Sequence, residues 1–187
     1  MIIAIVRHGT TMWNELNKIQ GQADPPLNAE GIALAKELGK KMKDELISYK
    51  AIFSSYRKRA KMTAELIRGN SKRSIFYDDL LNSRNLVIFS GMTLDEVKEK
   101  FLRDYLKWIN WDPKFCPPEG ESTRDLINRC KKFIEYLKNT FPKDSRILII
   151  THRENLALLG HQITGKWIND PLRTIKNCVV YRYKLEY

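Results

Sequence analysis

The sequence predicts an α/β domain of three layers, a three-layer sandwich in which helices flank a mainly parallel central sheet. Short apolar segments alternate along the chain with stretches whose apolar residues recur at helical spacing, which is typical of parallel strands joined by crossover helices. One of these segments, residues 147–150, is continuously apolar, as expected of a strand that is covered on both faces. The length of 187 residues without a long linker predicts a single domain, residues 1–187.

The expected elements follow one another in a regular order. Strands are predicted at residues 2–6, 51–53, 75–77, 147–150 and 179–185. Helices are predicted at residues 28–47, 57–68, 94–101, 123–141 and 154–163. Thr93 with Glu96, and Ser122 with Asp125, have the spacing of capping boxes, which predicts where two of these helices begin.

The composition is that of a globular protein with an excess of positive charge. Hydrophobic residues make up 43% and charged residues 29% of the chain, and the formal net charge is +11. Lysines alternate with acidic residues in the predicted helices, as on a solvated helix face, and no basic segment carries interleaved aromatic residues for stacking bases. We therefore expect a small phosphorylated substrate and no nucleic-acid partner.

The N-terminal apolar run, residues 1–6, is too short for a signal peptide or a membrane span. A cytoplasmic protein without a membrane partner is expected. Cys116, Cys130 and Cys178 are odd in number and lack metal-ligand spacing, so we expect neither a disulfide framework nor a metal site. His161 lies within an apolar helix pattern and is expected to be structural. Packing roles are also expected for the four tryptophans, Trp13, Trp108, Trp111 and Trp167.

Basic side chains follow three of the predicted strands. Arg7 and His8 come directly after the first strand, Arg59 comes shortly after the second, and His152 follows the continuously apolar strand. Because ligands of parallel sheets bind beyond the carboxyl ends of the strands, these side chains are expected to meet at one edge. Two arginines and two histidines at one place would form an anion site.

Five short motifs surround these positions and occur in order over nearly the whole chain. They are RHGTTMWN at residues 7–14, GQADPPLNAEG at 21–31, SSYRKRAKMTA at 54–64, PEGES at 118–122 and TH at 151–152. This set resembles the phosphoglycerate-mutase-like branch of the histidine phosphatase superfamily. The resemblance implies that His8 is the nucleophile and that Arg7, Arg59 and His152 line the phosphate pocket. Asn14 is similar to a family asparagine that contacts the phosphate or orients the site.

Phosphoryl transfer requires groups of this kind. The transition state carries charge on its equatorial oxygens, so catalysis needs fixed positive donors and a nucleophile in line with the leaving oxygen. His8 must attack through a neutral ring nitrogen, so we expect its other nitrogen to donate to a backbone carbonyl. A phosphohistidine intermediate would divide one difficult displacement into two easier steps. Neither a metal nor a cofactor is expected.

The resemblance fails at the general acid. The family carries a glutamate in a segment like L-x-E-x-x-x-G-x-x-x-G, and counting back from Gly91 places Ser83 at the acid position. The loss of a general acid costs about 10²–10⁴ in rate, and this penalty is smaller for aryl, acyl or anhydride leaving groups. Ser83 therefore indicates either an activated phosphate as substrate or a serine that was introduced to trap the substrate.

A third interpretation is that another carboxylate donates the proton. Glu154, two residues after His152, is the first candidate, and Asp78 and Asp79 are weaker ones. Glu154 also has a structural explanation, because acidic residues favour the first turn of a helix.

The sequence thus predicts a phosphatase that acts on small phosphorylated metabolites. The short span between Gly91 and Pro118 leaves little room for the insertions that resemble a mutase lid. Two alternatives stay open. A phosphoglycerate mutase would require 2,3-bisphosphoglycerate as cofactor, and a binding module would recognise a phosphorylated ligand without turning it over. Assembly into a homodimer is compatible with the sequence.

Overall fold

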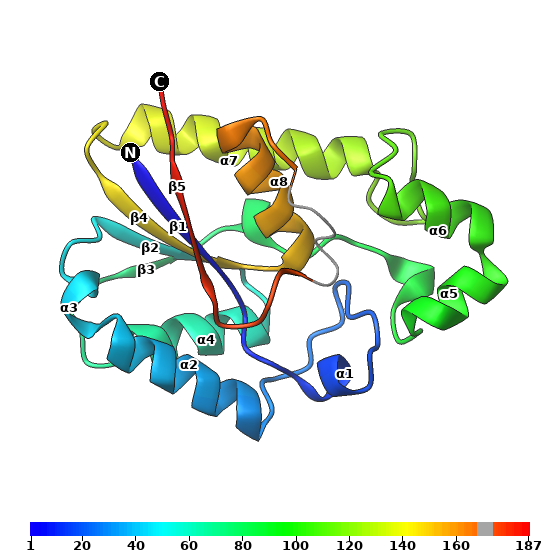
Figure 1. Ribbon diagram of the computed structural model, residues 1–187, viewed down its shortest axis with the longest axis horizontal. Coiled ribbons are helices and arrows are strands. Elements are labelled where there is room, and N and C mark those ends of the chain that lie inside the picture. The colour runs from blue at the N-terminus through cyan, green and yellow to red at the C-terminus, as the bar shows by residue number, and fades with distance from the viewer. Residues whose placement is uncertain (168–173) are drawn as a thin grey trace.

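A computed structural model describes residues 1–167 and 174–187, and it has the predicted layers (Figure 1). The sheet has five strands in the order β3-β2-β4-β1-β5. The strands are β1 (Ile2–Arg7), β2 (Ala51–Ser54), β3 (Ile75–Tyr77), β4 (Arg146–Thr151) and β5 (Val180–Lys184). The first four pair in parallel, and β5 pairs antiparallel with β1 at one edge. The prediction of a mainly parallel sheet is therefore confirmed.

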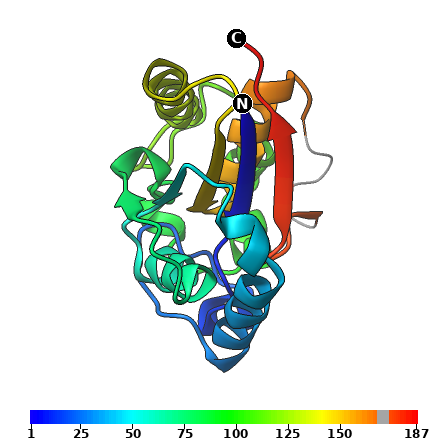
Figure 2. The same cartoon turned by 90° about the vertical axis from the view of Figure 1, so that its left-hand side faces the viewer.

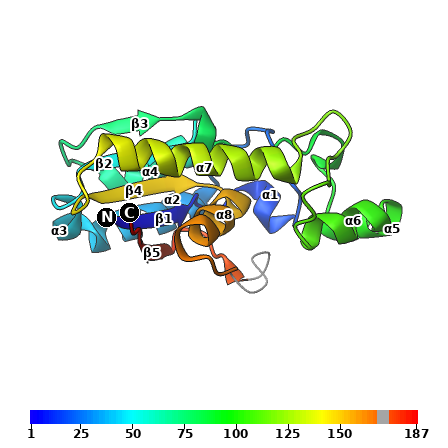
Figure 3. The ribbon, with the colours of Figure 1, turned by 90° about the horizontal axis from the view of Figure 1, so that it is seen from above.

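Helices cover both faces of this sheet (Figure 2). One face carries α2 (Ala29–Lys41), α3 (Lys43–Leu46) and α4 (Lys58–Arg68), and the other carries α7 (Thr123–Thr140) and α8 (Arg153–Thr164). Figure 1 shows α7 and α8 above the sheet and α2 and α4 below it, so in the view from above α7 and α8 lie in front of the sheet (Figure 3). Residues 147–150 of β4 have no exposed surface, as the continuous apolar run predicted.

The strand residues divide between the two cores by alternation. Ile3 and Ile5 pack with α7 and α8, whereas Ala4 and Val6 pack with residues of α4 and with Met42. Because successive side chains of β1 pack on opposite faces of the sheet, the strand is held on both faces up to its carboxyl end. The residues that follow β1 therefore start from a rigid position.

The predicted helix at residues 28–47 is wrong in one respect, because it is two helices. The chain leaves α2 at Met42, which is both the C-cap of α2 and the N-cap of α3. Met42 and Leu46 are both buried in the same core. Their spacing of one helical turn continues across the break, so the apolar pattern could not indicate it.

The two predicted capping boxes differ. Thr93 and Glu96 form the reciprocal pair of hydrogen bonds that defines a capping box. Ser122 accepts a hydrogen bond from the Asp125 N–H at 3.0 Å, but the Asp125 carboxylate contacts the Ser122 hydroxyl at 2.6 Å. A reciprocal box was therefore the wrong prediction at Ser122, because aspartate is one methylene shorter than glutamate and binds the hydroxyl instead of the backbone N–H.

A small helical lobe extends beyond the carboxyl ends of the strands, at the right of Figure 1. It consists of α5 (Leu94–Lys100) and α6 (Leu102–Ile109), with the 3-10 turns η1 (Asp79–Leu81) and η2 (Val87–Phe89) leading into it. The lobe has its own core, which includes Phe89, Trp108 and Phe115. The sequence predicted α5 and missed α6 and the short helix α1 (Met12–Glu15).

No helix in the described ranges is both long and apolar enough to cross a membrane. The three cysteines are free thiols, as predicted, and only Cys116 is exposed.

Candidate active site

A pocket of about 380 Å³ lies where the carboxyl end of the sheet meets the helical lobe. All the residues that the sequence placed in the site, apart from the two weaker acid candidates, line it. They are Arg7, His8, Asn14, Arg59, Ser83, His152 and Glu154. Segments far apart in the chain thus supply one pocket, as the rule for parallel sheets predicted.

His8 is buried at the floor of this pocket with only 3% of its surface exposed. Its Nδ1 lies 2.7 Å from the carbonyl oxygen of Gly9, and its Nε2 lies 3.3 Å from Nε of Arg59. A guanidinium can only donate, so Nε2 accepts and Nδ1 carries the proton that binds Gly9. Burial, followed by the charges of Arg59 and Arg7, holds the pKa of His8 well below its ordinary value. His8 is therefore a neutral imidazole with a lone pair on Nε2.

The loop after β1 depends on two glycines. A Cβ on Gly9 would come within 2.7 Å of the carbonyl oxygen of Gly31, and one on Gly31 within 2.1 Å of the carbonyl oxygen of Thr10. The first turn of α2 thus packs directly on the backbone beside His8. The Gly9 N–H also donates to Thr63 Oγ1 at 2.9 Å, which ties the loop to α4. These contacts fix the backbone carbonyl that orients the His8 ring.

Arg59 and Arg7 are held as charged donors by backbone carbonyls. Arg59 donates to Ala23 at 2.7 Å and to Gly21 at 2.9 Å, and Arg7 donates to Ile175 at 2.9 Å. Burial lowers the pKa of Arg59 to about 10. Burial, followed by the charges of Arg153 and Arg59, lowers the pKa of Arg7 to about 9. Buried like charges of this kind are stabilised when an anion binds between them.

His152 lies beside His8 with a ring-to-ring distance of 5.2 Å. It is the N-cap residue of α8 and is 3% exposed. Its Nε2 lies 2.8 Å from the hydroxyl oxygen of Ser55. Burial, followed by the charges of Arg59 and His8, holds the pKa of His152 well below its ordinary value. The pocket floor therefore combines neutral imidazoles with charged guanidiniums.

Asn14 lines the pocket, but its amide oxygen is already used. This oxygen accepts from the Thr11 N–H at 3.1 Å and lies 3.2 Å from the Thr11 hydroxyl, as part of the cap of α1. The group of Asn14 that can contact a phosphoryl oxygen is consequently its NH₂. Asn177, which the sequence did not indicate, also lines the pocket and donates to the His8 carbonyl at 2.6 Å.

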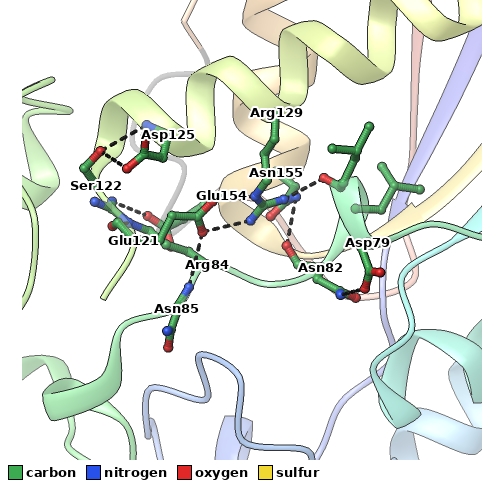
Figure 4. Close-up of polar contacts among 12 residues, drawn as sticks. Asp79, Asn82, Arg84, Asn85, Glu121, Ser122, Asp125, Arg129, Glu154 and Asn155 are labelled. Atoms are coloured by element: carbon green, nitrogen blue, oxygen red, sulfur yellow. Dashed lines mark hydrogen bonds and ion pairs between the residues drawn. The ribbon is translucent and has the colours of Figure 1, made fainter. Parts of the chain in front are cut away.

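Ser83, which the motif count places at the family's acid position, also lines the pocket. The next residue, Arg84, is fully buried, and its side chain points into a network of polar groups (Figure 4). It donates to the Glu121 carbonyl and to Thr123 Oγ1, both at 3.0 Å, and forms an ion pair of 3.3 Å with Glu154. Sequence reasoning missed Arg84, because it falls at an unspecified position of the family segment that ends at Gly91.

Glu154 is anchored from two sides. Its Oε1 accepts from Arg84 Nη1 at 3.3 Å and from the indole N–H of Trp108 at 2.8 Å. Since Trp108 belongs to α6, this carboxylate joins the helix that follows His152 to the helical lobe. Only 12% of the Glu154 side chain is exposed, and it lines the pocket.

The weaker acid candidates lie outside this pocket. Asp78 caps η1 by accepting from the Leu80 N–H at 2.8 Å, and Asp79 accepts from the Asn82 amide at 2.6 Å. Their carboxylates accept local hydrogen bonds and do not line the pocket, so a role as general acid stays a prediction for both.

The packing prediction is confirmed for Trp108, which is 4% exposed, and both Trp13 and Trp108 also line the pocket. Trp108 is also packed on Phe89, so it serves both the core of the lobe and the pocket wall. Trp111 and Trp167 do stack on each other at 5.2 Å, and His161 stacks on Trp167 at 3.9 Å, which confirms packing roles for these three.

Within residues 1–167 and 174–187 no group of three or more histidine, cysteine, aspartate or glutamate side chains could hold a metal ion. What the pocket does provide is a cluster of two arginines and two histidines at the carboxyl ends of parallel strands, in which His8, Arg59 and His152 are buried.

The chain belongs to the histidine phosphatase superfamily (branch 1), whose family model matches residues 3–187. GpmB of Escherichia coli O1:K1, named a probable phosphoglycerate mutase, is 31% identical over 182 residues, which cover 96% of this chain and 83% of GpmB. The resemblance seen in the motifs is therefore confirmed.

Solved structures agree with this assignment. Bacillus stearothermophilus YhfR superposes with a TM-score of 0.81 at 26% identity, over 97% of this chain and 89% of YhfR. A mycobacterial glucosyl-3-phosphoglycerate phosphatase has the same fold, with a TM-score of 0.83 at 22% identity over 97% of this chain and 91% of its own. The α-ribazole phosphatase of Shigella flexneri superposes with a TM-score of 0.82 at 23% identity, over 97% of this chain and 89% of its own. Proteins with this fold thus include named phosphatases, and a curated relative is named a probable phosphoglycerate mutase.

Proposed function

We propose that the protein is a phosphatase that hydrolyses small phosphorylated metabolites through a phosphohistidine on His8. The observation that carries the proposal is the state of the His8 ring: Nδ1–H is bound to Gly9, and the unprotonated Nε2 faces a pocket with Arg7, Arg59 and His152. A neutral, oriented imidazole among fixed cations is what attack on a phosphoryl group requires.

The reaction then has two displacements at phosphorus. In the first, the Nε2 lone pair forms the P–N bond as the P–O bond to the leaving group breaks, and the leaving oxygen takes up a proton. In the second, water attacks phosphorus and loses a proton, the P–N electrons return to Nε2, and phosphate departs. Arg7 and Arg59 hold the equatorial oxygens in both steps, where their charge lowers the barrier.

The leaving-group end of the pocket favours an activated substrate. Ser83 cannot protonate an alkoxide, so phosphate esters of aryl alcohols, acyl phosphates or anhydrides suit the site better than alkyl esters. Glu154 is the second candidate for the missing acid. Its contacts with Arg84 and Trp108 both use Oε1 as an acceptor, and they suit a carboxylate better than a proton donor.

The experiment that tests the proposal is to trap the intermediate. The protein is mixed with an aryl phosphate, quenched in alkali, digested and examined by mass spectrometry. We expect one phosphoryl group on the peptide that contains His8, and none in His8→Ala. Rapid turnover without a phosphorylated His8 peptide at any quench time would contradict the proposal.

A phosphoglycerate mutase is the second candidate, and the 31% identity to GpmB over 96% of the chain favours it. A mutase would require 2,3-bisphosphoglycerate for activity on phosphoglycerate, whereas the proposed phosphatase would release phosphate without it. A module that only binds phosphate compounds would show tight binding and no turnover of any ester.

A further inference from the structure

A chain of hydrogen bonds behind His152 begins at a group that can only donate. The backbone N–H of Tyr56 donates to Asn82 Oδ1 at 2.9 Å, which fixes the orientation of the Asn82 amide. Its NH₂ donates in turn to Asp79 at 2.6 Å, as Figure 4 shows, where a carboxylate can only accept. The amide oxygen of Asn82 therefore faces Ser55 as an acceptor.

The hydrogen bonds of Ser55 determine which nitrogen of His152 carries the proton. Its hydroxyl has one hydrogen, and the bond of 2.9 Å to Asn82 Oδ1 uses it. The hydroxyl oxygen also accepts from the Arg57 N–H at 3.1 Å. The contact of 2.8 Å between Ser55 Oγ and His152 Nε2 must then be donated by His152. The proton of the neutral His152 ring consequently lies on Nε2.

His152 Nδ1 is left with a lone pair. It is buried and has no hydrogen-bond partner among the described residues. The titratable groups that surround the ring on neighbouring elements are cationic or can accept a proton. They are Arg57 at the N-cap of α4, Arg59 on α4, His8 after β1, and Arg129 on α7. On its own helix, Arg153 and Glu154 follow it. These surroundings keep the ring neutral while the pocket holds no anion.

A phosphoryl oxygen carries negative charge and lone pairs, so it cannot bind an unprotonated nitrogen. We propose that binding of a phosphoryl group is coupled to the uptake of one proton at His152 Nδ1, and that Ser55 and Asn82 are positioning residues that set this requirement. The inference rests on the phosphate site of the proposed function. The bound anion offsets the surrounding positive charge and so makes the second proton on the ring favourable.

This proton does not replace the missing general acid. His152 lies beside His8, at 5.2 Å between ring centres, whereas in-line attack by His8 places the leaving oxygen on the far side of phosphorus. The protonated Nδ1 would reach an equatorial oxygen. His152 therefore strengthens binding of the phosphoryl group, and the demand for a good leaving group remains.

The test is calorimetric titration with sulfate at neutral pH in two buffers of different ionisation enthalpy. Sulfate remains a dianion there, so any proton taken up must go to the protein. We expect uptake of about one proton per bound sulfate. His152→Gln should bind sulfate more weakly with uptake near zero. His161→Gln, which changes a histidine of the same helix outside the pocket, should keep the full uptake.

Ser55→Ala separates the positioning role from a structural one. Without the Ser55 oxygen, the neutral ring is free to carry its proton on Nδ1 and can bind the anion directly. Sulfate should still bind while the uptake falls well below one proton. Nitrogen chemical shifts of His152 in the unchanged chain give the same information if Ser55→Ala does not fold: Nδ1 should change from unprotonated to protonated when sulfate binds.

Sulfate binding without proton uptake would overturn the inference and leave the phosphate site intact. Uptake that persists in His152→Gln and disappears in His8→Asn would also overturn it, because the proton would then be on His8. If neither sulfate nor inorganic phosphate binds at all, both the inference and the proposed function fail.

Discussion

The two ends of the pocket are held in place by different kinds of contact. At the phosphate end, His8, Arg7 and Arg59 are each held by backbone carbonyls of nearby loops. At the leaving-group end, Glu154 is held by side chains, through an ion pair with the buried Arg84 and a hydrogen bond from the indole N–H of Trp108. One end presents fixed donors to a phosphoryl group, and the other joins the sheet to the helical lobe.

In the proposed function, the phosphate end carries out phosphoryl transfer and the leaving-group end selects the substrate. The phosphate end contains the groups that the family motifs imply, and these are the groups that the proposed phosphohistidine mechanism requires. The leaving-group end carries Ser83 and the ion pair of Arg84 with Glu154. Under the proposed function, Ser83 stands in place of a proton donor, and this end decides which substrates react because it meets the leaving oxygen.

The largest expected effect concerns the phosphate end. His8→Ala should lower turnover of an aryl phosphate by roughly 10⁴–10⁶, because it removes the nucleophile. Steady-state kinetics measures the loss, and an unchanged thermal unfolding midpoint would show that the fold persists. Residual activity within tenfold of the unchanged chain would mean that water attacks the substrate directly, and the contrast between the two ends would break down.

The next effect concerns the stability of the leaving-group end. Arg84→Met removes one partner of a pair with 0% and 12% side-chain exposure, so it should lower the free energy of unfolding by about 3–5 kcal/mol. Urea denaturation measures the change. The double variant Arg84→Met with Glu154→Gln should recover part of it, because no unpaired charge remains.

Lys41→Met is the matched control for Arg84→Met. It removes a partner from the exposed pair with Glu37, where both side chains are more than half exposed, and should leave the free energy of unfolding nearly unchanged. Equal losses at the two positions would show that Arg84 is not a buried anchor.

A smaller effect is expected when the glutamate that the family carries is introduced at position 83. Ser83→Glu should raise turnover of an alkyl phosphate by roughly 10²-fold, since the new carboxyl can protonate an alkoxide, and should change turnover of an aryl phosphate little. Ser83→Gln has the same size without a transferable proton and should give no gain. If both substitutions raised turnover of the alkyl phosphate by a comparable factor, the gain would come from the larger side chain and not from proton transfer.

The smallest effect is the pH dependence of stability. His8 and His152 have lowered pKa values in the folded state, so below the ordinary pKa the unfolded chain binds more protons than the folded one. Stability should therefore fall as the pH decreases below about 6.5, by up to about 1.4 kcal/mol per pH unit for each histidine.

Urea midpoints across this pH range measure that slope. His152→Gln should reduce it, whereas His161→Gln should reduce it less. A slope that is the same in all three chains would mean that acidic residues dominate the dependence.

The phosphate end could be predicted from sequence because its residues directly follow strands or lie within contiguous motifs. The position of Arg7 and His8 after β1 fixes where they lie once the sheet is known. The leaving-group end could not, since Glu154 meets Arg84 and Trp108 only in the folded chain, across 70 and 46 positions of sequence. Helix α6 itself was missed because Phe101, with φ −135°, breaks the helical pattern between α5 and α6.

The hydrogen-bond chain from Asn82 through Ser55 to His152 was also beyond the sequence. Ser55 lies within a matching motif and Asn82 directly precedes Ser83, but their contact spans 27 positions and depends on the orientation of an amide. Spacing along the chain carries no information on which atom of a side chain donates. Only the packed structure assigns the tautomer of His152.

The central claim is that an intact phosphate end works without a general acid at position 83. The most direct measurement is the dependence of kcat/KM on leaving-group basicity, over a series of aryl phosphates extended to an alkyl phosphate. We predict a steep decline as the leaving group becomes more basic, and a much shallower one in Ser83→Glu. A shallow dependence in the unchanged chain would contradict the claim, because another group would then be protonating the leaving oxygen.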